Sequence, residues 1–273
     1  MLESHAAPSP APAPMPPDGQ RRAESGPSIE LRQLTYAAPL RWLRLGWHDF
    51  MRSPRIGLFY GLCFVLMGWS LAKVFESSPA YVLALSGSFL LMGPFLCFGM
   101  YRVSQRLENG ETPGFADSVL AWKTRTGQLG IFGVVLLVLE MLWARSTLVV
   151  FAVTFDGMPD FKGSLLALVS GENLTFLVVW LVLGVLFATL IYSVSVVSIP
   201  MILHQRTDAI TSGLTSVRLV LTQTGVMTFW AIIITTLVVL ALLPMYVGML
   251  VVGPVLGHAS WHAYREAVEV EAT

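Results

Sequence analysis

Long apolar runs, separated by short polar or basic segments, occupy most of the chain after about residue 56. A helix that crosses the hydrocarbon core of a bilayer needs about 20 mostly apolar residues. Six segments meet this requirement, so the pattern predicts an all-α, polytopic membrane protein with six transmembrane helices. The predicted spans cover residues 56–74, 81–101, 129–148, 174–199, 226–243 and 245–262.

The last two predicted spans belong to one apolar run, residues 225–262. A single helix of this length would extend about 57 Å, nearly twice the thickness of the hydrocarbon core. Proline ends or kinks a helix, and Pro244 lies near the middle of the run. We therefore expect the chain to turn at Pro244.

Basic residues predict the orientation of the spans, because lysines and arginines near span ends stay on the cytoplasmic side. With six spans and a cytoplasmic N-terminus, all but three of the 17 lysines and arginines lie on that side. The exceptions are Lys73 and Lys162, outside, and Arg145, within or at the end of a span. An odd number of spans would place many of the lysines and arginines outside the cytoplasm. We therefore expect a multi-pass protein with both termini in the cytoplasm.

Three cytoplasmic stretches have apolar residues at the three-and-four spacing of an amphipathic helix. We interpret them as helices that lie in the membrane interface, with the apolar face toward lipid and arginines toward the headgroups. Their apolar positions are Leu40, Leu43, Trp47, Phe50 and Met51; Phe115, Val119 and Trp122; and Ile210, Leu214, Val217 and Leu221.

Each amphipathic stretch precedes an outward and an inward span, so the chain reads as three copies of one hairpin unit. Copies that all begin and end in the cytoplasm have parallel orientation, which predicts a bundle with a pseudo-threefold axis along the membrane normal. Alternatively, the three hairpins are unrelated, because any three hairpins would give the same coarse pattern of apolar and polar segments. A proline lies near the inner end of each inward span, and we interpret these prolines as kinks that either serve packing or line a cavity: Pro94, Pro200 and Pro254.

Segments at both ends of the chain are predicted to lie outside the membrane. Residues 1–34 contain a Pro/Ala tract followed by a polar stretch, a composition that buries too little apolar area to offset chain entropy. We therefore expect a disordered cytoplasmic tail there, a six-span membrane domain over residues 35–266, and a short cytoplasmic tail over residues 267–273.

Composition supports a membrane protein, since 55% of residues are hydrophobic and 12% are charged, whereas soluble domains carry about 25% charged residues. The net charge is zero, and the sequence offers no basic face for nucleic acid. The partner that the sequence implies is the lipid bilayer, with another membrane protein or a second copy as further options. Cys63 and Cys97 lie in apolar runs and are interpreted as buried thiols.

GPVLGHASWHAYR, at residues 253–265, resembles the closing motif of a family of predicted bacterial integral membrane proteins, the domain of unknown function 2189. Residues 93–111 are similar to the exit of that family's second span, with Gly99-Met100-Tyr101 where a Gly-Tyr pair is more usual. Residues 199–223 are similar to its third cytoplasmic segment. The resemblance covers roughly residues 35–266 and implies a protein of the bacterial cytoplasmic (inner) membrane with unknown activity. Some members of the family carry a cytochrome c oxidase label.

Glu140 is the most informative single residue for function. If the third span begins near Leu129, Glu140 lies about 16 Å deep, close to the middle of the bilayer. An ionised carboxylate there is costly, so Glu140 is protonated, paired or turned toward a polar interior. It is a candidate proton or cation site, or else a protonated carboxyl that hydrogen-bonds between spans. Arg145 is poorly placed to pair with it, because five positions separate the two on one helix.

His258 and His262 form the second candidate site. Their spacing of four places both imidazoles on one helical face, as a metal or haem site requires. Their position at the cytoplasmic rim, with few other histidines near the spans, favours instead polar anchors beside Trp261 and Tyr264 in an aromatic belt. We expect no metal and no cofactor.

The sequence matches no phosphate loop, nucleophile elbow, zinc-protease helix or paired-carboxylate hydrolase. Polar residues are few within the predicted spans, so an intramembrane enzyme ranks third among the functional hypotheses. The first hypothesis is a non-enzymatic role, either a small-solute or ion pathway or a membrane-organising component, with Glu140 and Arg145 as its site. The alternative is an accessory or assembly subunit of a respiratory complex of the cytochrome oxidase type.

Overall fold

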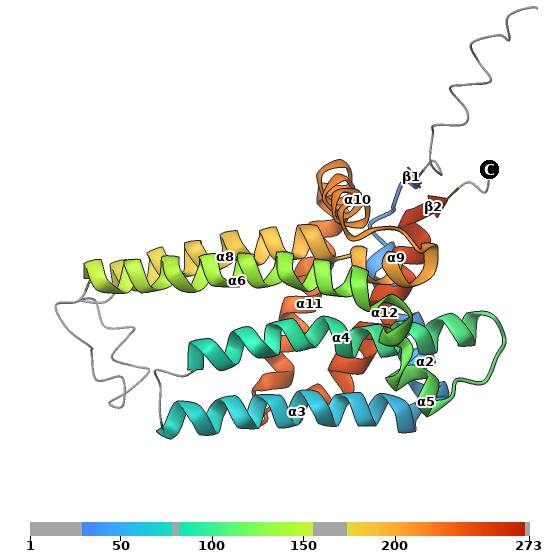
Figure 1. The fold of residues 1–273 in the computed structure, drawn as a ribbon, viewed down its shortest axis with the longest axis horizontal. Coiled ribbons are helices and arrows are strands. Elements are labelled where there is room, and N and C mark those ends of the chain that lie inside the picture. Colours follow the sequence, from blue (N-terminus) through green and yellow to red (C-terminus); the bar gives the residue numbers. More distant parts are fainter. Residues whose placement is uncertain (1–28, 78–81, 155–173, 271–273) are drawn as a thin grey trace, which may run out of the picture.

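The computed structural model describes residues 29–77, 82–154 and 174–270, and these are mostly helical (Figure 1). In chain order the helices are α2 (Ala38–Arg52), α3 (Pro54–Ser77), α4 (Val82–Glu108), α5 (Phe115–Val119), α6 (Thr126–Thr154), α8 (Leu174–Ser195), α9 (Ser198–Gln205), α10 (Ala209–Thr222), α11 (Thr224–Leu242) and α12 (Met249–Ala267). A 3-10 helix covers Ala121–Arg125, and two short strands are β1 (Ile29–Leu31) and β2 (Val268–Val270). The prediction of an all-α protein is confirmed.

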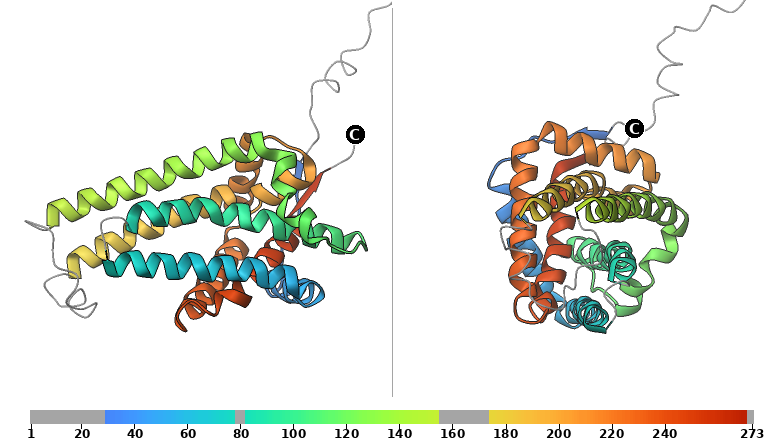
Figure 2. Two further views of the ribbon diagram at one scale, coloured as in Figure 1. Left: turned by 60° about the horizontal axis from the view of Figure 1, so that its bottom comes forward. Right: turned by 90° about the vertical axis from the view of Figure 1, so that its left-hand side faces the viewer.

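The helices form two sets that run in different directions. The long helices α3, α4, α6 and α8 extend in a similar direction, and the right-hand view of Figure 2 shows them nearly end-on. Helices α2, α11 and α12 lie steeply across them. The predicted bundle of three equivalent parallel hairpins is therefore not what the structure shows, because the third hairpin, α11–α12, crosses the first two instead of running beside them.

Four stretches of the described residues are long and apolar enough to cross a membrane: Pro54–Val74, Phe115–Thr154, Leu174–Gln205 and Thr224–Leu242. They correspond to the first, third, fourth and fifth predicted spans. The second and sixth predicted spans fall on α4 and α12, which are not among the four. For α12 the composition explains this, since its second half carries two histidines, Arg265 and Glu266.

The predicted turn at Pro244 is confirmed, since α11 ends at Leu242 and α12 begins at Met249. Met245 and Tyr246 have φ angles of 54° and 67°, in the left-handed region that residues other than glycine adopt rarely. The indole Nε1 of Trp69, on α3, donates a hydrogen bond to the Met245 carbonyl at 2.8 Å. This contact attaches the turn to the long helices.

The three prolines interpreted as kinks lie at different positions in their helices. Pro94 lies inside α4 and Pro254 inside α12, where each removes one backbone hydrogen bond. Pro200 lies in the first turn of α9, directly after the interruption that separates α9 from α8. The prolines are therefore not at equivalent places in three copies of one unit.

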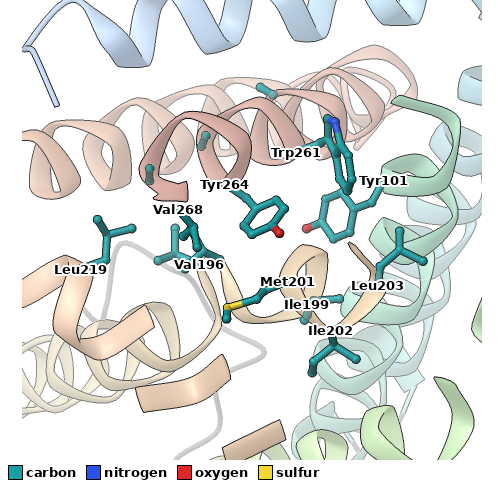
Figure 3. Packing of buried hydrophobic residues seen from close by; sticks show 14 of the residues in the cluster. Tyr101, Val196, Ile199, Met201, Ile202, Leu203, Leu219, Trp261, Tyr264 and Val268 are labelled. Carbon is teal, nitrogen blue, oxygen red and sulfur yellow. The ribbon is translucent and has the colours of Figure 1, made fainter. Parts of the chain in front are cut away.

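Helix α12 is the centre of the packing. It contacts α2, α3, α4, α9 and α11, and its residues Gly253 to Ala259 are buried without interruption. Figure 3 shows the core continuing through Trp261 and Tyr264 of α12 toward α9. On the other side, Trp42 of α2 and Trp230 of α11 are fully buried and meet edge to face, with ring centroids 5.5 Å apart.

The three amphipathic stretches are helical where the sequence predicts helices, but α2 uses its surface differently. Phe50, predicted on the lipid-facing stripe of α2, is buried, whereas Trp47 and Met51 are exposed. The reason is that α2 packs its other face, which includes Phe50, against the protein. In α10 three residues of the apolar stripe are exposed, Ile210, Leu214 and Leu221, and Val217 is half-buried.

Two short strands lie within the segments predicted as tails. β1 pairs antiparallel with β2, with Glu30 opposite Glu269, and Arg32 forms a bidentate contact with Glu269 at 2.8 and 2.6 Å. Both strands alternate aliphatic and charged residues, the two-residue period of a strand with one packed face. The structured part therefore extends further toward both ends than predicted, while residues 1–28 and 271–273 of the predicted tails lie outside the described residues.

Substitution of Gly46 tests the packing of α2 on α12. A Cβ at this position would lie 2.6 Å from both the Ala259 nitrogen and the Val255 carbonyl oxygen, which are backbone atoms that cannot move aside. We expect Gly46→Val to reduce the free energy of unfolding by about 1–3 kcal/mol, the usual cost of overpacking, measured by thermal unfolding in detergent. Gly130→Val is the matched control, since a Cβ there meets nothing within 4 Å. Equal stability of the two variants would contradict the packing.

Candidate functional site

Three buried polar side chains and one half-buried histidine, His262, gather at the second half of α12. They are Asp49 of α2, Ser104 of α4, and His258 and His262 of α12, and we call these four residues the α12 polar cluster. Asp49 is 5% exposed, and Ser104 and His258 are each 1% exposed. The structure thus places the two predicted histidines beside two residues that the sequence analysis did not single out.

Hydrogen bonds join the α12 polar cluster across three helices. The Ser104 hydroxyl oxygen lies 2.8 Å from Nδ1 of His258, and Nε2 of His262 lies 2.9 Å from Oδ2 of Asp49. A carboxylate only accepts hydrogen bonds, so His262 donates to Asp49. Nε2 of His258 is buried and has no hydrogen-bond partner among the residues that the structure describes.

Small residues bring the helices close enough to bury these groups. Gly46 lets the α2 backbone approach that of α12, and Gly257 accommodates the Met100 side chain of α4, which a Cβ would meet. The histidines share a face of α12 because they are four positions apart. Their polar atoms are consequently enclosed by α2 and α4, and each ring pairs with a group from one of these two helices.

Burial alone would raise the pKa of the Asp49 carboxyl, because it disfavours the charged form. Hydrogen bonds from His262 and Ser104, together with the nearby imidazoles, outweigh this effect and hold the pKa of Asp49 below its usual value. Asp49 is therefore a carboxylate at neutral pH. Its charge is stabilised by direct contacts instead of by water.

A second set of contacts ties α12 to the end of α4. Glu108 accepts hydrogen bonds from Nε1 of Trp261 at 3.0 Å and from Nε of Arg265 at 2.9 Å. Burial opposes ionisation of Glu108, but these two partners lower its pKa below the usual range. The helix is thus fixed to α4 by a charge-assisted contact one turn beyond Ser104.

The aromatic-belt interpretation is wrong for Trp261 and Tyr264. Both side chains are fully buried, and Figure 3 shows them pointing into the core. The Tyr264 hydroxyl lies 2.9 Å from Nδ1 of His204 on α9. These rings contact protein and not lipid headgroups, because α4 and α9 cover the side of α12 that carries them.

The α12 polar cluster contains a hydroxyl, an imidazole and a carboxylate, the groups of many acyl-transfer sites. Its connections differ from those of such a site, since the histidine that contacts Ser104 is His258, whereas the histidine that contacts Asp49 is His262. The 1% exposure of Ser104 also leaves no access for a substrate. Within the described residues, no group of three or more His, Cys, Asp or Glu side chains could hold a metal ion. The geometry thus suits the cluster to joining three helices.

Glu140 lies apart from the α12 polar cluster, on the buried face of α6. It is 6% exposed, and its Oε1 has no hydrogen-bond partner among the described residues. The hydroxyl of Thr147, two turns along the same buried face, is likewise unpaired in that part of the chain. Arg145 is exposed. The structure therefore does not bring Glu140 and Arg145 together as one site, and it adds Thr147 to the face that carries Glu140.

Some of the residues that sequence reasoning missed have a signal in the sequence. Asp49 follows Trp42 and Gly46 at the spacing of a second helical stripe, which is the face that α2 buries. Thr147 follows Glu140 by seven positions, also on one face. Ser104 and Glu108 have no such signal, because their partners lie more than 150 residues away in the chain.

A comparison with family models provides independent support for the membrane assignment. Residues 82–204 match the family described as predicted integral membrane protein (DUF2189). The resemblance to this family is confirmed. The DUF2189 segment runs from α4 to α9, so it includes Ser104, Glu108 and Glu140 but neither α2 nor α12. No curated protein and no solved structure matches the chain.

Removal of the Ser104 hydroxyl tests the α12 polar cluster. Ser104→Ala leaves Nδ1 of the buried His258 without its partner, and an unsatisfied buried polar group costs about 1–3 kcal/mol. We expect a lower unfolding temperature in detergent. Ser70→Ala serves as the control, because the exposed Ser70 hydroxyl bonds only the Leu66 carbonyl of its own helix. Equal unfolding temperatures for the two variants would show that the His258 contact adds no stability.

Acid should destabilise the protein through Asp49 and Glu108. Both carboxyls have lowered pKa values in the folded state, so their contribution to stability is complete above the ordinary carboxyl pKa of about 4. It is lost as the pH falls through the lower pKa of the folded protein. We expect the unfolding temperature to fall between about pH 5 and pH 3, and to fall less in Asp49→Asn. The same pH dependence in both proteins would exclude a role for Asp49.

Proposed function

We propose that this protein is a non-enzymatic integral membrane protein in which Glu140 provides a site for a proton or a small cation. The observation that carries the proposal is the buried Glu140 carboxyl, with an unpaired oxygen, inside a candidate span. Ionisable residues inside membrane segments are rare because they are costly, and they commonly mark ion or proton pathways.

The surroundings of Glu140 support an intramembrane location. In the apolar windows of the candidate spans formed by α6 and α8, only 11% and 6% of the residues are buried, and both helices expose many large aliphatic side chains. Such surfaces are expected to face lipid. Glu140 is on the opposite, buried face of α6, where a carboxyl group is shielded from acyl chains and can either hold a proton or release it and bind a cation as the carboxylate.

The proposal places the protein in the cytoplasmic membrane of a bacterium, with both termini in the cytoplasm. The orientation rests on the distribution of lysines and arginines along the sequence. In this arrangement the α12 polar cluster lies toward the cytoplasmic side, and Glu140 lies close to the middle of the bilayer.

Glu140→Gln tests the proposal in vesicles that contain the full chain. We expect the native protein to dissipate an imposed proton or monovalent-cation gradient faster than empty vesicles, and Glu140→Gln to reduce the rate to that of empty vesicles. Gln keeps the size of the side chain and removes its charge, and equal unfolding temperatures of the two proteins in detergent would show that unfolding does not account for the loss. The readout is the fluorescence of an internal pH-sensitive or cation-sensitive dye.

The control is Glu30→Gln, which changes an exposed carboxyl on β1 and should leave the flux unchanged. Native-like flux in Glu140→Gln would refute the role of Glu140. Absence of flux from the native protein would also refute the pathway, and would favour the membrane-organising role.

The second candidate is an accessory or assembly subunit of a respiratory complex. The exposed aliphatic side chains of α6 and α8 favour it, because another membrane protein could cover them as readily as lipid. Co-purification of an oxidase with the chain in mild detergent would support this role. Isolation of the chain alone under the same conditions would count against it.

A further inference from the structure

An apolar groove of about 430 Å³ lies between α2, α11 and α12. Leu40, Leu43 and Trp47 line it from α2, and Leu237 lines it from α11. The wall formed by α12 consists of four aliphatic side chains between Val251 and Leu256. The groove is separate from both Glu140 and the α12 polar cluster, so its occupant does not depend on the function proposed for Glu140.

Arg44 is the one charged residue among the described residues that line this groove. It is exposed, and no carboxylate of the described chain forms an ion pair with it. Arg41, three positions earlier, is by contrast paired with Glu266 of α12. The Arg44 guanidinium therefore keeps its hydrogen-bond donors available for an anion, and its planar geometry suits a phosphate.

The rim of the groove has the chemistry of a membrane interface. Trp47 is 49% exposed and lies one turn from Arg44 on α2, and tryptophan is enriched at the level of lipid headgroups. Leu40 is also exposed, and α11 presents large aliphatic residues such as Ile232 and Leu240 outside the groove. The groove thus opens among apolar side chains, beside an arginine and a tryptophan.

We propose that the groove binds one anionic glycerophospholipid, with an acyl chain between α2, α11 and α12 and the phosphate on Arg44. An acyl chain matches a groove that is lined mainly by aliphatic side chains, and the lipid headgroup supplies the anion that Arg44 lacks. Residues 1–28 of the same chain are a poorer occupant, because they are rich in proline and alanine and contain few long aliphatic side chains.

Selectivity for lipid headgroups tests the role of Arg44. The full chain in detergent is incubated with an equimolar mixture of phosphatidylglycerol and phosphatidylcholine, and bound lipid is counted by native mass spectrometry. One arginine near a membrane surface corresponds to a preference of about fivefold for the anionic lipid. We expect this preference in the native protein, its loss in Arg44→Gln, and its retention in Arg52→Gln, which removes another exposed arginine of α2 that does not line the groove.

The position of the acyl chain is tested by fluorescence quenching with phospholipids brominated on the acyl chain. The chain has eight tryptophans, so the signal of Trp47 is taken as the difference between the native protein and Trp47→Phe. We expect brominated phosphatidylglycerol to quench this component, and Val252→Phe, which narrows the groove, to reduce the quenching.

Three outcomes would overturn the proposal. They are equal headgroup preference in Arg44→Gln and Arg52→Gln, a Trp47 component that brominated lipid does not quench, and a disulfide between two copies of Leu43→Cys that forms at the expense of lipid binding. The last outcome would assign the groove to a second copy of the chain.

Discussion

The fold depends on the close approach of two helix backbones, α2 and α12. Gly46 lies directly against the backbone of Val255 and Ala259, with no space for a side chain. At this separation the side chains on either side of the contact are enclosed, whether they are apolar, such as Trp42 and Phe50, or polar, such as Asp49. A carboxylate enclosed in this way is stable only with partners. His262 and Ser104 meet this requirement, so the α12 polar cluster is a consequence of the backbone contact.

The same contact explains why α12 differs from the helices around it. Few residues of α6 and α8 are buried, and many of their large aliphatic side chains are exposed, so a bilayer would cover surfaces that are aliphatic along their length. α12 is covered by protein instead, which allows its second half to carry two histidines, an arginine and a glutamate. A helix with that composition would be costly in hydrocarbon. Here each of these four side chains has a hydrogen-bond partner on α2 or α4.

The sequence predicts the features that depend on neighbouring residues and not those that depend on tertiary contacts. The lengths of the apolar runs predict the four candidate spans of the structure, and Pro244 predicts the turn between α11 and α12. The direction of the third hairpin cannot be inferred in this way, because it follows from the fit of Gly46 and Gly257 to residues far away in the chain. For the same reason the spacing of His258 and His262 correctly predicts a shared face but does not identify what that face contacts. Their partners, Asp49 and Ser104, come from two other helices.

The α12 polar cluster and Glu140 are both polar sites inside the protein, but only one of them is suited to bind an ion. In the α12 polar cluster Asp49 has partners, and its ionisation stabilises contacts between helices. The buried atom of this cluster without a partner among the described residues is Nε2 of His258, whose ring is already held by Ser104. A group that is already satisfied gains little by binding an ion, and releasing it would weaken the packing of α2 and α4 on α12. Glu140 has no such partner among the described residues and lies on α6, whose main contacts are with α8, α4 and α10 and not with α2 or α12. Binding of a proton or cation there would relieve an unpaired carboxyl without disturbing the α2–α12 contact. The free-energy cost of burying the Glu140 carboxyl is therefore not offset by contacts with other side chains. This makes Glu140, and not the histidines, the site where binding of a proton or cation would be favourable.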